Sequence, residues 1–207
     1  LTGNLSIESL VMDSIRLDTV KLNIKSDHDK FIYTAQVINN KRNPQYVFRA
    51  IIDGELNEHG SLLKAKLYDA NQKLGIQFGL LAKMEQNGIR MSLLGDNPIL
   101  GYKTFNANEG NYVFLGDDKR LSANLQLKSA DGMGIQLFTD DENKEALQDL
   151  TFSLNKFKLH DILSVLPYTP NVSGVLNGDY HLIQTKDEMS VSSNMTIDKM
   201  VYENCPM

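Results

Sequence analysis

The stretch VSGVLNGDYHLIQTKDEMSVSSNMTID, residues 172–198, decides the fold because apolar and polar residues alternate along most of it. Its first half places every second residue on one face: Val172, Gly174, Leu176, Gly178, Tyr180 and Leu182. Beyond Lys186-Asp187, the apolar residues Val191, Met195 and Ile197 alternate with Ser, Asn, Thr and Asp. A period of two is typical of a strand with one face in an apolar interior. The stretch therefore predicts two long antiparallel strands joined by a tight turn.

The same alternation recurs along the rest of the chain. Turn-forming residues separate the runs at Asn57–Gly60, Asp69–Gln72, Gln86–Gly88, Asn108–Gly110 and Asp131-Gly132. Connections this short force neighbouring strands to be antiparallel. Asn87-Gly88 between two alternating runs is a strong hairpin signal. It predicts that two sets of residues share one face: Leu74, Ile76, Phe78 and Leu80, and Ile89, Met91 and Leu93.

The predicted strands are unusually long. These runs give roughly a dozen strands. A strand of about twelve residues reaches ~40 Å at ~3.3 Å per residue, whereas ordinary strands measure ~17–20 Å. Compact sandwiches rarely need strands so long and one-sided. We therefore expect an all-β fold in which long antiparallel strands form a curved, partly open groove, as a single β-rich segment over residues 1–207.

Three irregularities interrupt the pattern. The alternation in Ser14–Ser26 changes phase near Thr19-Val20, which predicts a β-bulge. Pro44, in the polar run Asn39–Gln45, cannot continue a hydrogen-bonded ladder and predicts a loop. The acidic run Asp140–Glu145 predicts a second, solvated loop.

One segment has helical instead of strand spacing. In FKLHDILSVLP the apolar residues Leu159, Ile162, Leu163 and Leu166 lie at i, i+3, i+4 and i+7. Pro167 then ends the pattern. The spacing predicts a short helix near residues 158–166 whose apolar stripe is buried against one end of the sheet.

Composition excludes several classes of protein. Of the 207 residues, 42% are hydrophobic, which supports a core instead of a disordered chain. The net charge is −5, and the chain has no basic block, so nucleic acid is not an expected partner. No run of about 18 apolar residues occurs that would span a bilayer. The single Cys205 cannot form an internal disulfide. The start at Leu1 and the final YENCPM indicate a piece of a longer protein, with any signal or anchor outside it.

Residues with catalytic or metal-binding chemistry are sparse and scattered. Asp53, Glu55 and His59 come closest to a metal-ligand spacing, but they fit a solvated hairpin end better. Asp179 and His181 share a strand face and could pair, yet no serine stands in a nucleophile-elbow motif. No GxGxxG or P-loop motif occurs. We therefore predict no catalytic residue, no metal ligand and no cofactor.

The region from Leu147 to Met207 resembles the repeat of TamB and the wider AsmA-like family of bacterial envelope proteins. In that pattern a strand runs into a short apolar helix that ends in Leu-Pro, followed by a strand of the form V-S-G-x-L-x-G and a second alternating strand. The matching segments here are LTFSLNKFKLHDILSVLP, NVSGVLNGDYHLI and MSVSSNMTIDKMVYENCPM. Upstream, DSIRLDTVKLNI and YKTFNANEGNYVFLGDDKRLSANLQLKS resemble strand blocks of the same family.

The resemblance implies a long, partly open β groove, or taco, in the bacterial periplasm. Such a groove moves phospholipid along an apolar interior toward the outer membrane, so phospholipid acyl chains are the expected ligand. Some family members are also linked to outer-membrane assembly, which adds an outer-membrane β-barrel assembly protein as an expected partner. The residues that we expect to line the groove are Ile76, Phe78, Leu80, Leu121, Leu125, Leu127, Val191, Met195 and Ile197.

Two other classes of function stay open at the level of sequence. A structural or adhesive surface β domain would show a filled core and no long apolar trough. An enzyme on a β scaffold, such as a glycan hydrolase, would need two carboxylates ~5–9.5 Å apart in a cleft.

Overall fold

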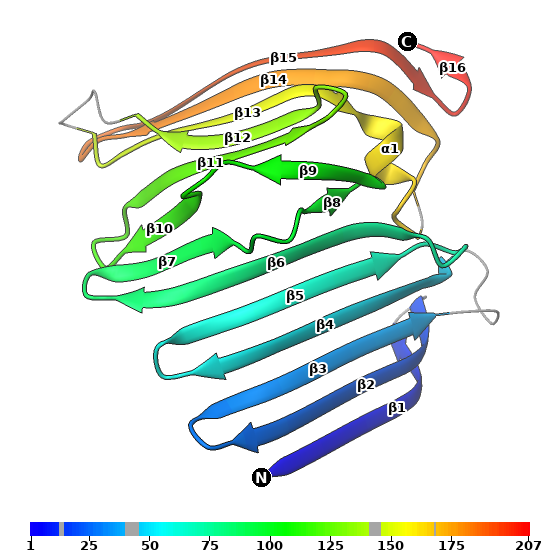
Figure 1. The fold of residues 1–207 in the computed structure, drawn as a ribbon. Coiled ribbons are helices and arrows are strands. Elements are labelled where there is room, and N and C mark those ends of the chain that lie inside the picture. Colours follow the sequence, from blue (N-terminus) through cyan, green and yellow to red (C-terminus); the bar gives the residue numbers. More distant parts are fainter. Residues whose placement is uncertain (13–14, 40–45, 141–145, 168) are drawn as a thin grey trace.

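The computed structural model describes residues 1–12, 15–39, 46–140, 146–167 and 169–207, and it is almost entirely β (Figure 1). The longer strands are β1 (Thr2–Met12), β2 (Ile15–Asp27), β3 (Lys30–Asn39), β4 (Phe48–Asn57), β5 (Gly60–Tyr68), β6 (Leu74–Glu85), β11 (Leu121–Ser129), β13 (Gln148–Lys158), β14 (Val172–Gln184) and β15 (Met189–Tyr202). The shorter ones are β7 (Gly88–Leu93), β8 (Ile99–Leu100), β9 (Lys103–Ala107), β10 (Tyr112–Gly116), β12 (Gly134–Thr139) and β16 (Cys205–Pro206). The helix is α1 (Leu159–Leu163).

All sixteen strands belong to one antiparallel sheet, which confirms the predicted fold class. Outside the segment β7–β10, neighbours along the chain are neighbours in the sheet, whose order is β1-β2-β3-β4-β5-β6-β7-β10-β11-β12-β13-β14-β15-β16. Alternate turns of such a meander lie at opposite margins of the sheet (Figure 1). We call them the α1 margin, which contains α1 and the turns at residues 69–73, 101–102 and 130–133, and the hairpin margin, which contains the turns at 28–29, 58–59, 86–87, 117–120 and 185–188.

The middle of the sheet contains a seam of four short strands. β7 and β8 lie end to end along β6, and β9 and β10 lie end to end along β11. β7 pairs with β10, and β8 pairs with β9. The turn residues Asn108–Gly110 therefore do not close a hairpin between the strands that flank them. The backbone N–H of Gln126 instead donates to the side-chain oxygen of Asn108 at 2.8 Å, so the segment between β9 and β10 stays beside β11.

The Asn87-Gly88 hairpin has the predicted faces but a different turn. Leu80 pairs with Leu93, and Met84 pairs with Ile89, so their side chains share one face, as do Ile76 and Phe78 by alternation. The prediction is wrong for Leu74, which lies beyond a register shift and pairs with Tyr68 on the opposite face. The turn residues are Gln86 and Asn87, because Gly88 already pairs with Glu85 as the first residue of β7. Gly88 is needed there because a Cβ would clash with the Leu115 carbonyl of β10.

The predicted helix exists but is shorter than expected. It spans Leu159–Leu163 instead of residues 158–166, because the chain turns after Leu163. The expected burial of Leu166 is wrong, since its side chain is 40% exposed, and Leu159, Ile162 and Leu163 are only half-buried. Val165, which lies off the predicted stripe, is the buried residue, at 1% exposed.

The other irregularities differ in detail from their predictions. β2 pairs with β1 and β3 without a register shift, so the bulge predicted near Thr19-Val20 is wrong, and Leu17 and Val20 point to opposite faces of an unbroken strand. The irregular residue is Ser9 of β1, with φ 69°. In β14 the alternation is regular from Leu176 to Leu182, and the register shifts near Gly174. The loops predicted at Pro44 and, beyond Asp140, in the acidic run lie outside the described residues.

A candidate apolar binding face

One face of the sheet is apolar from its first long strand to its last. Cross-strand partners point to the same face. One line of partners runs from β1 to β6 through Leu5, Leu22, Ala35, Ile52, Ala65 and Phe78. A second runs through the seam at Ala82, Met91, Val113 and Ala123. A third runs from β11 to β15 through Leu125, Leu137, Phe152, Tyr180 and Ser193. We call this the inner face.

All nine residues that the sequence selects as groove candidates lie on the inner face. Ile76, Phe78 and Leu80 belong to β6 and are half-buried, as are Leu121 and Leu125 of β11, whereas Leu127 is buried. Val191 and Met195 of β15 are exposed, and Ile197 is half-buried. The pairs Leu182–Val191 and Gly178–Met195 place the β15 residues on the same face as the others.

The inner face is packed toward the α1 margin. Its core consists of Phe105, Leu127 and Met133, with Leu125 and Phe157 among the partly buried residues that pack against it. Phe105 and Met133 are both 0% exposed. These side chains come from strands of the same sheet, including β8, β9, β11 and β13, and pack against one another.

From the middle of the strands to the hairpin margin the inner face is open. Ten large apolar side chains of this face are exposed: Leu5, Ile24, Phe31, Ile52, Leu56, Met84, Leu115, Met189, Val191 and Met195. Val191 is 64% exposed and Met84 is 60% exposed. Apolar patches this extensive on soluble proteins mark sites that bind a partner, a membrane or an apolar ligand.

Charge is almost absent from the described part of the inner face. In β3–β7 and β10–β15, none of the residues named in the three lines of partners is Asp, Glu, Lys or Arg. The same holds for the residues two positions before and after each of them in its strand. Charged residues occupy inward positions near the α1 margin, at Arg16 and Asp18 of β2 and at Lys103 of β9. The arrangement can hold an apolar molecule by area alone, at ~25 cal/mol per Å² removed from water.

The turn between β8 and β9 fixes α1 to the sheet. Tyr102 donates its hydroxyl to Asp69 at 2.7 Å and to the Ser164 carbonyl at 3.2 Å. Burial raises the pKa of Tyr102, and the hydrogen bond to Asp69 raises it further, to about 12. Gly75 and Gly101 allow the close approach, because a Cβ at Gly75 would clash with Val165 and one at Gly101 would lie 2.7 Å from the Asp161 carbonyl oxygen.

A lysine links β9, α1 and the β11–β12 turn at the same margin. Lys103 bonds Asp131 of the β11–β12 turn and Asp161 of α1, each at 2.6 Å. Burial alone would lower the pKa of Lys103, but the two carboxylates outweigh it and raise the pKa to about 12. Hydrogen bonds from Lys103, Ser129 and Lys158 hold the pKa of Asp131 well below its usual range. These contacts fix α1 and the β11–β12 turn to β9.

The residues considered for chemistry are not brought together. His181 does not pair with Asp179; it lies 2.6 Å from Asp149, on the face opposite the apolar one. Glu55 bonds Lys30 at 2.8 Å, and His59 lies 3.3 Å from Glu58. Among the described residues there is no group of three or more His, Cys, Asp or Glu side chains that could hold a metal ion.

Sequence reasoning missed several of the most exposed inner-face residues. Met84, Leu115 and Met189 continue the inward phase of their strands, but each lies beside a turn. A count of every second residue carried through to the ends of the strands would have included them.

Comparison of the chain with family models, curated proteins and solved structures finds no match. Within the described residues, no helix has the length and apolar character that a membrane crossing requires.

Proposed function

We propose that this protein binds the acyl chains of phospholipids on its inner face and conducts them along it. The observation that carries the proposal is the row of ten exposed, large apolar side chains on one face of one sheet. Each buried CH₂ of an acyl chain contributes about 0.8 kcal/mol, so a flexible chain that covers these side chains gains affinity without any specific polar contact.

The distribution of packing favours this proposal over a structural or adhesive domain. A purely structural domain gains stability by covering its apolar face with side chains, as the core of Phe105, Leu127 and Met133 does near α1. That cover stops at the middle of the strands, where Ile52 and Met195 are exposed. Open apolar area costs stability unless a ligand covers it.

The biological setting is part of the proposal and rests on the resemblance to the TamB and AsmA-like family alone. In that setting the protein acts in the periplasm of a bacterial envelope and passes phospholipid toward the outer membrane. An outer-membrane β-barrel assembly protein would be its partner. The proposal assigns no enzymatic activity and no cofactor.

Binding can be tested with the purified 207-residue chain and vesicles of palmitoyl-oleoyl-phosphatidylethanolamine. After the vesicles are removed, organic extraction and mass spectrometry of the protein fraction should release lipid in near-stoichiometric amount. Met195→Asp should reduce that amount, because it places a carboxylate on the inner face. Thr196→Asp, one residue away on the opposite face and paired with the uncharged Asn177, is the matched control and should retain the lipid. Equal lipid recovery from the two variants, or none from the parent chain, would reject the proposal.

A further inference from the structure

The face opposite the inner one, here called the outer face, differs sharply between the two halves of the sheet. On β2–β7 it carries many charges: Lys21, Lys25, Arg49, Asp53, Glu55, Lys64, Lys66, Lys83 and Arg90. On β11–β15 it carries mostly uncharged Ser, Thr, Asn and Gln. One line of partners there reads Gln126, Gln136, Ser153, Asp179 and Asn194, with a single charge across five strands.

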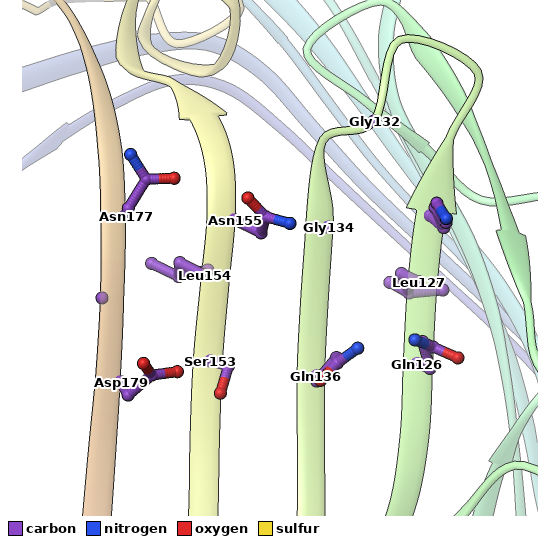
Figure 2. Close-up of a pocket in the computed structure, with 12 residues that line it drawn as sticks. Gln126, Leu127, Gly132, Gly134, Gln136, Ser153, Leu154, Asn155, Asn177 and Asp179 are labelled. Carbon is purple, nitrogen blue, oxygen red and sulfur yellow. The ribbon is translucent and has the colours of Figure 1, made fainter. Parts of the chain in front are cut away.

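A hollow of about 380 Å³ lies in this less charged half. Figure 2 views it with the polar side chains toward the reader, and faint strands of the first half pass behind, on the apolar side. Gly134 contributes no side chain between Lys128 and Asn155, its partners in register, which leaves the depression open. Gln136, Ser153 and Asp179 border it below, and Asn177 borders it above. The Asn177 amide is oriented by a 2.7 Å hydrogen bond from the Lys156 amide.

An exposed aromatic ring lies beside the hollow. Phe138 follows Gln136 by two residues in β12 and therefore points to the same outer face. It is 38% exposed and breaks the alternation of its strand. Its cross-strand partners are Asn124 and Thr151, so an apolar surface is surrounded by hydrogen-bonding groups.

We propose that this hollow, together with Phe138, binds a neutral, flat oligosaccharide. Amides and hydroxyls both donate and accept hydrogen bonds, and a carboxylate accepts them through two adjacent oxygens, which matches the vicinal hydroxyls of a sugar. The apolar C–H face of a pyranose ring can cover Phe138. A phosphate-rich ligand would need several cations, and Lys128 is the one Lys or Arg among the residues that line the hollow.

The site is suited to binding and not to glycan hydrolysis. Glycoside hydrolysis needs two carboxyl groups about 5–9.5 Å apart on either side of the scissile bond. Asp179 supplies the one carboxylate among the lining residues. Sugar binding is also independent of the acyl-chain proposal, because the two ligands occupy opposite faces of the sheet.

The test is a titration of the ¹⁵N-labelled 207-residue chain with cellotetraose, followed by NMR. Saturable shifts in the millimolar range should be confined to the amides of β11–β14, including the side-chain NH₂ groups of Gln126 and Gln136. Phe138→Ala should weaken binding about fivefold. Ile32→Ala removes the exposed apolar residue of the charged half of the outer face, at 36% exposed, and should leave binding unchanged.

A second variant keeps the test independent of any loss of stability. Gly134→Gln fills the hollow from its floor, and an added Cβ there would lie 3.7 Å from its nearest neighbours, an ordinary contact. This variant should fold normally and lose cellotetraose binding. The proposal is overturned if cellotetraose causes no saturable shift in the parent chain. It is also overturned if Gly134→Gln binds as tightly as the parent, or if the shifts spread evenly over both halves of the outer face.

Discussion

The α1 margin and the hairpin margin are built from the same strands and the same alternation, yet they differ in what covers the inner face. At the α1 margin the short strands β8 and β9 bring Leu100 and Phe105 against Leu127 and Met133, and Phe105 is fully buried. At the hairpin margin, in the described residues, side chains such as Met84 and Val191 are more than half exposed. Alternation therefore specifies an apolar face, whereas the short strands β8 and β9 decide where that face becomes a packed core and where it stays open.

The largest loss of stability is expected at the centre of the core near the α1 margin. Phe105→Ala should lower the free energy of unfolding by about 3–5 kcal/mol, because it leaves a cavity in a fully packed cluster. Val191→Ala, on the same face at the open margin, should change it by less than about 1 kcal/mol. Urea denaturation of both variants measures the contrast. Similar losses at the two positions would mean that the hairpin margin is packed as tightly as the α1 margin.

A smaller effect is expected where α1 approaches the sheet. Gly75→Ala introduces a Cβ into the space of the Val165 side chain, and this overpacking should cost about 1–3 kcal/mol. Gly95→Ala is the matched control, because nothing lies within 4 Å of its added Cβ. Thermal denaturation that leaves both variants at the parent's midpoint would show that Val165, just after α1, is not in close contact with β6.

Removing Lys103, which links β9, α1 and the β11–β12 turn, should lower the free energy of unfolding by a smaller amount. Lys103→Met removes the partner of Asp131 and Asp161 and should cost about 1–2 kcal/mol in urea denaturation. Arg120→Met, at the hairpin margin, breaks a more exposed 3.4 Å contact with Asp118 and should cost less than about 0.5 kcal/mol. If the two variants lost the same free energy of unfolding, the ion pairs at the α1 margin would be no stronger than those at the hairpin margin.

The smallest expected effect is on the pH dependence of stability. The pKa of Tyr102 is raised to about 12 in the folded protein, from about 10 in the unfolded chain. Its contribution is therefore complete below pH ~10 and is lost as the pH rises toward the folded pKa. Tyr102→Phe should lack this alkaline loss. The difference between the parent and the variant should shrink between pH ~10 and 12, and a constant difference would contradict the assignment.

The contribution of Asp131 to stability depends on pH in the opposite direction from that of Tyr102. The folded pKa of Asp131 is lowered, so its contribution is complete above the unfolded pKa of about 4 and is lost as the pH falls below it. Asp131→Asn should be less stable than the parent at pH 7, with a difference that narrows in acid. If the difference widened in acid, the hydrogen bonds of Lys103 and Ser129 to Asp131 would not be the cause.

Sequence alone predicts the faces of the sheet better than its connections. The side-chain period of two places Phe78, Leu125 and Met195 on one face whatever the turns do. The end-to-end arrangement of β9 and β10 along β11 is not predictable in the same way, because Asn108–Gly110 has the composition of a hairpin turn. Whether such residues close a hairpin depends on pairing with a strand more distant in the sequence.

Burial was also only partly predictable. The helical spacing identifies the α1 segment, but not the turn after Leu163 that buries Val165 and exposes Leu166. The cover over Phe105 depends on the seam of short strands, and local periodicity contains no signal for it. For Leu125 this has a practical consequence: it packs against the Phe105 cluster, so a charge there would unfold the sheet and would not report on lipid binding. Met195 is the better position.

Lipid should contact the open part of the inner face and not the outer face of the same strands. Its most direct test is a photo-crosslinking amino acid placed in turn at Val191 and Ser192, which are adjacent in β15 and point to opposite faces. The full 207-residue chain, incubated with phosphatidylethanolamine vesicles and irradiated, should give lipid adducts at position 191 and not at position 192. Adducts at both positions in equal yield, or at neither, would contradict the account.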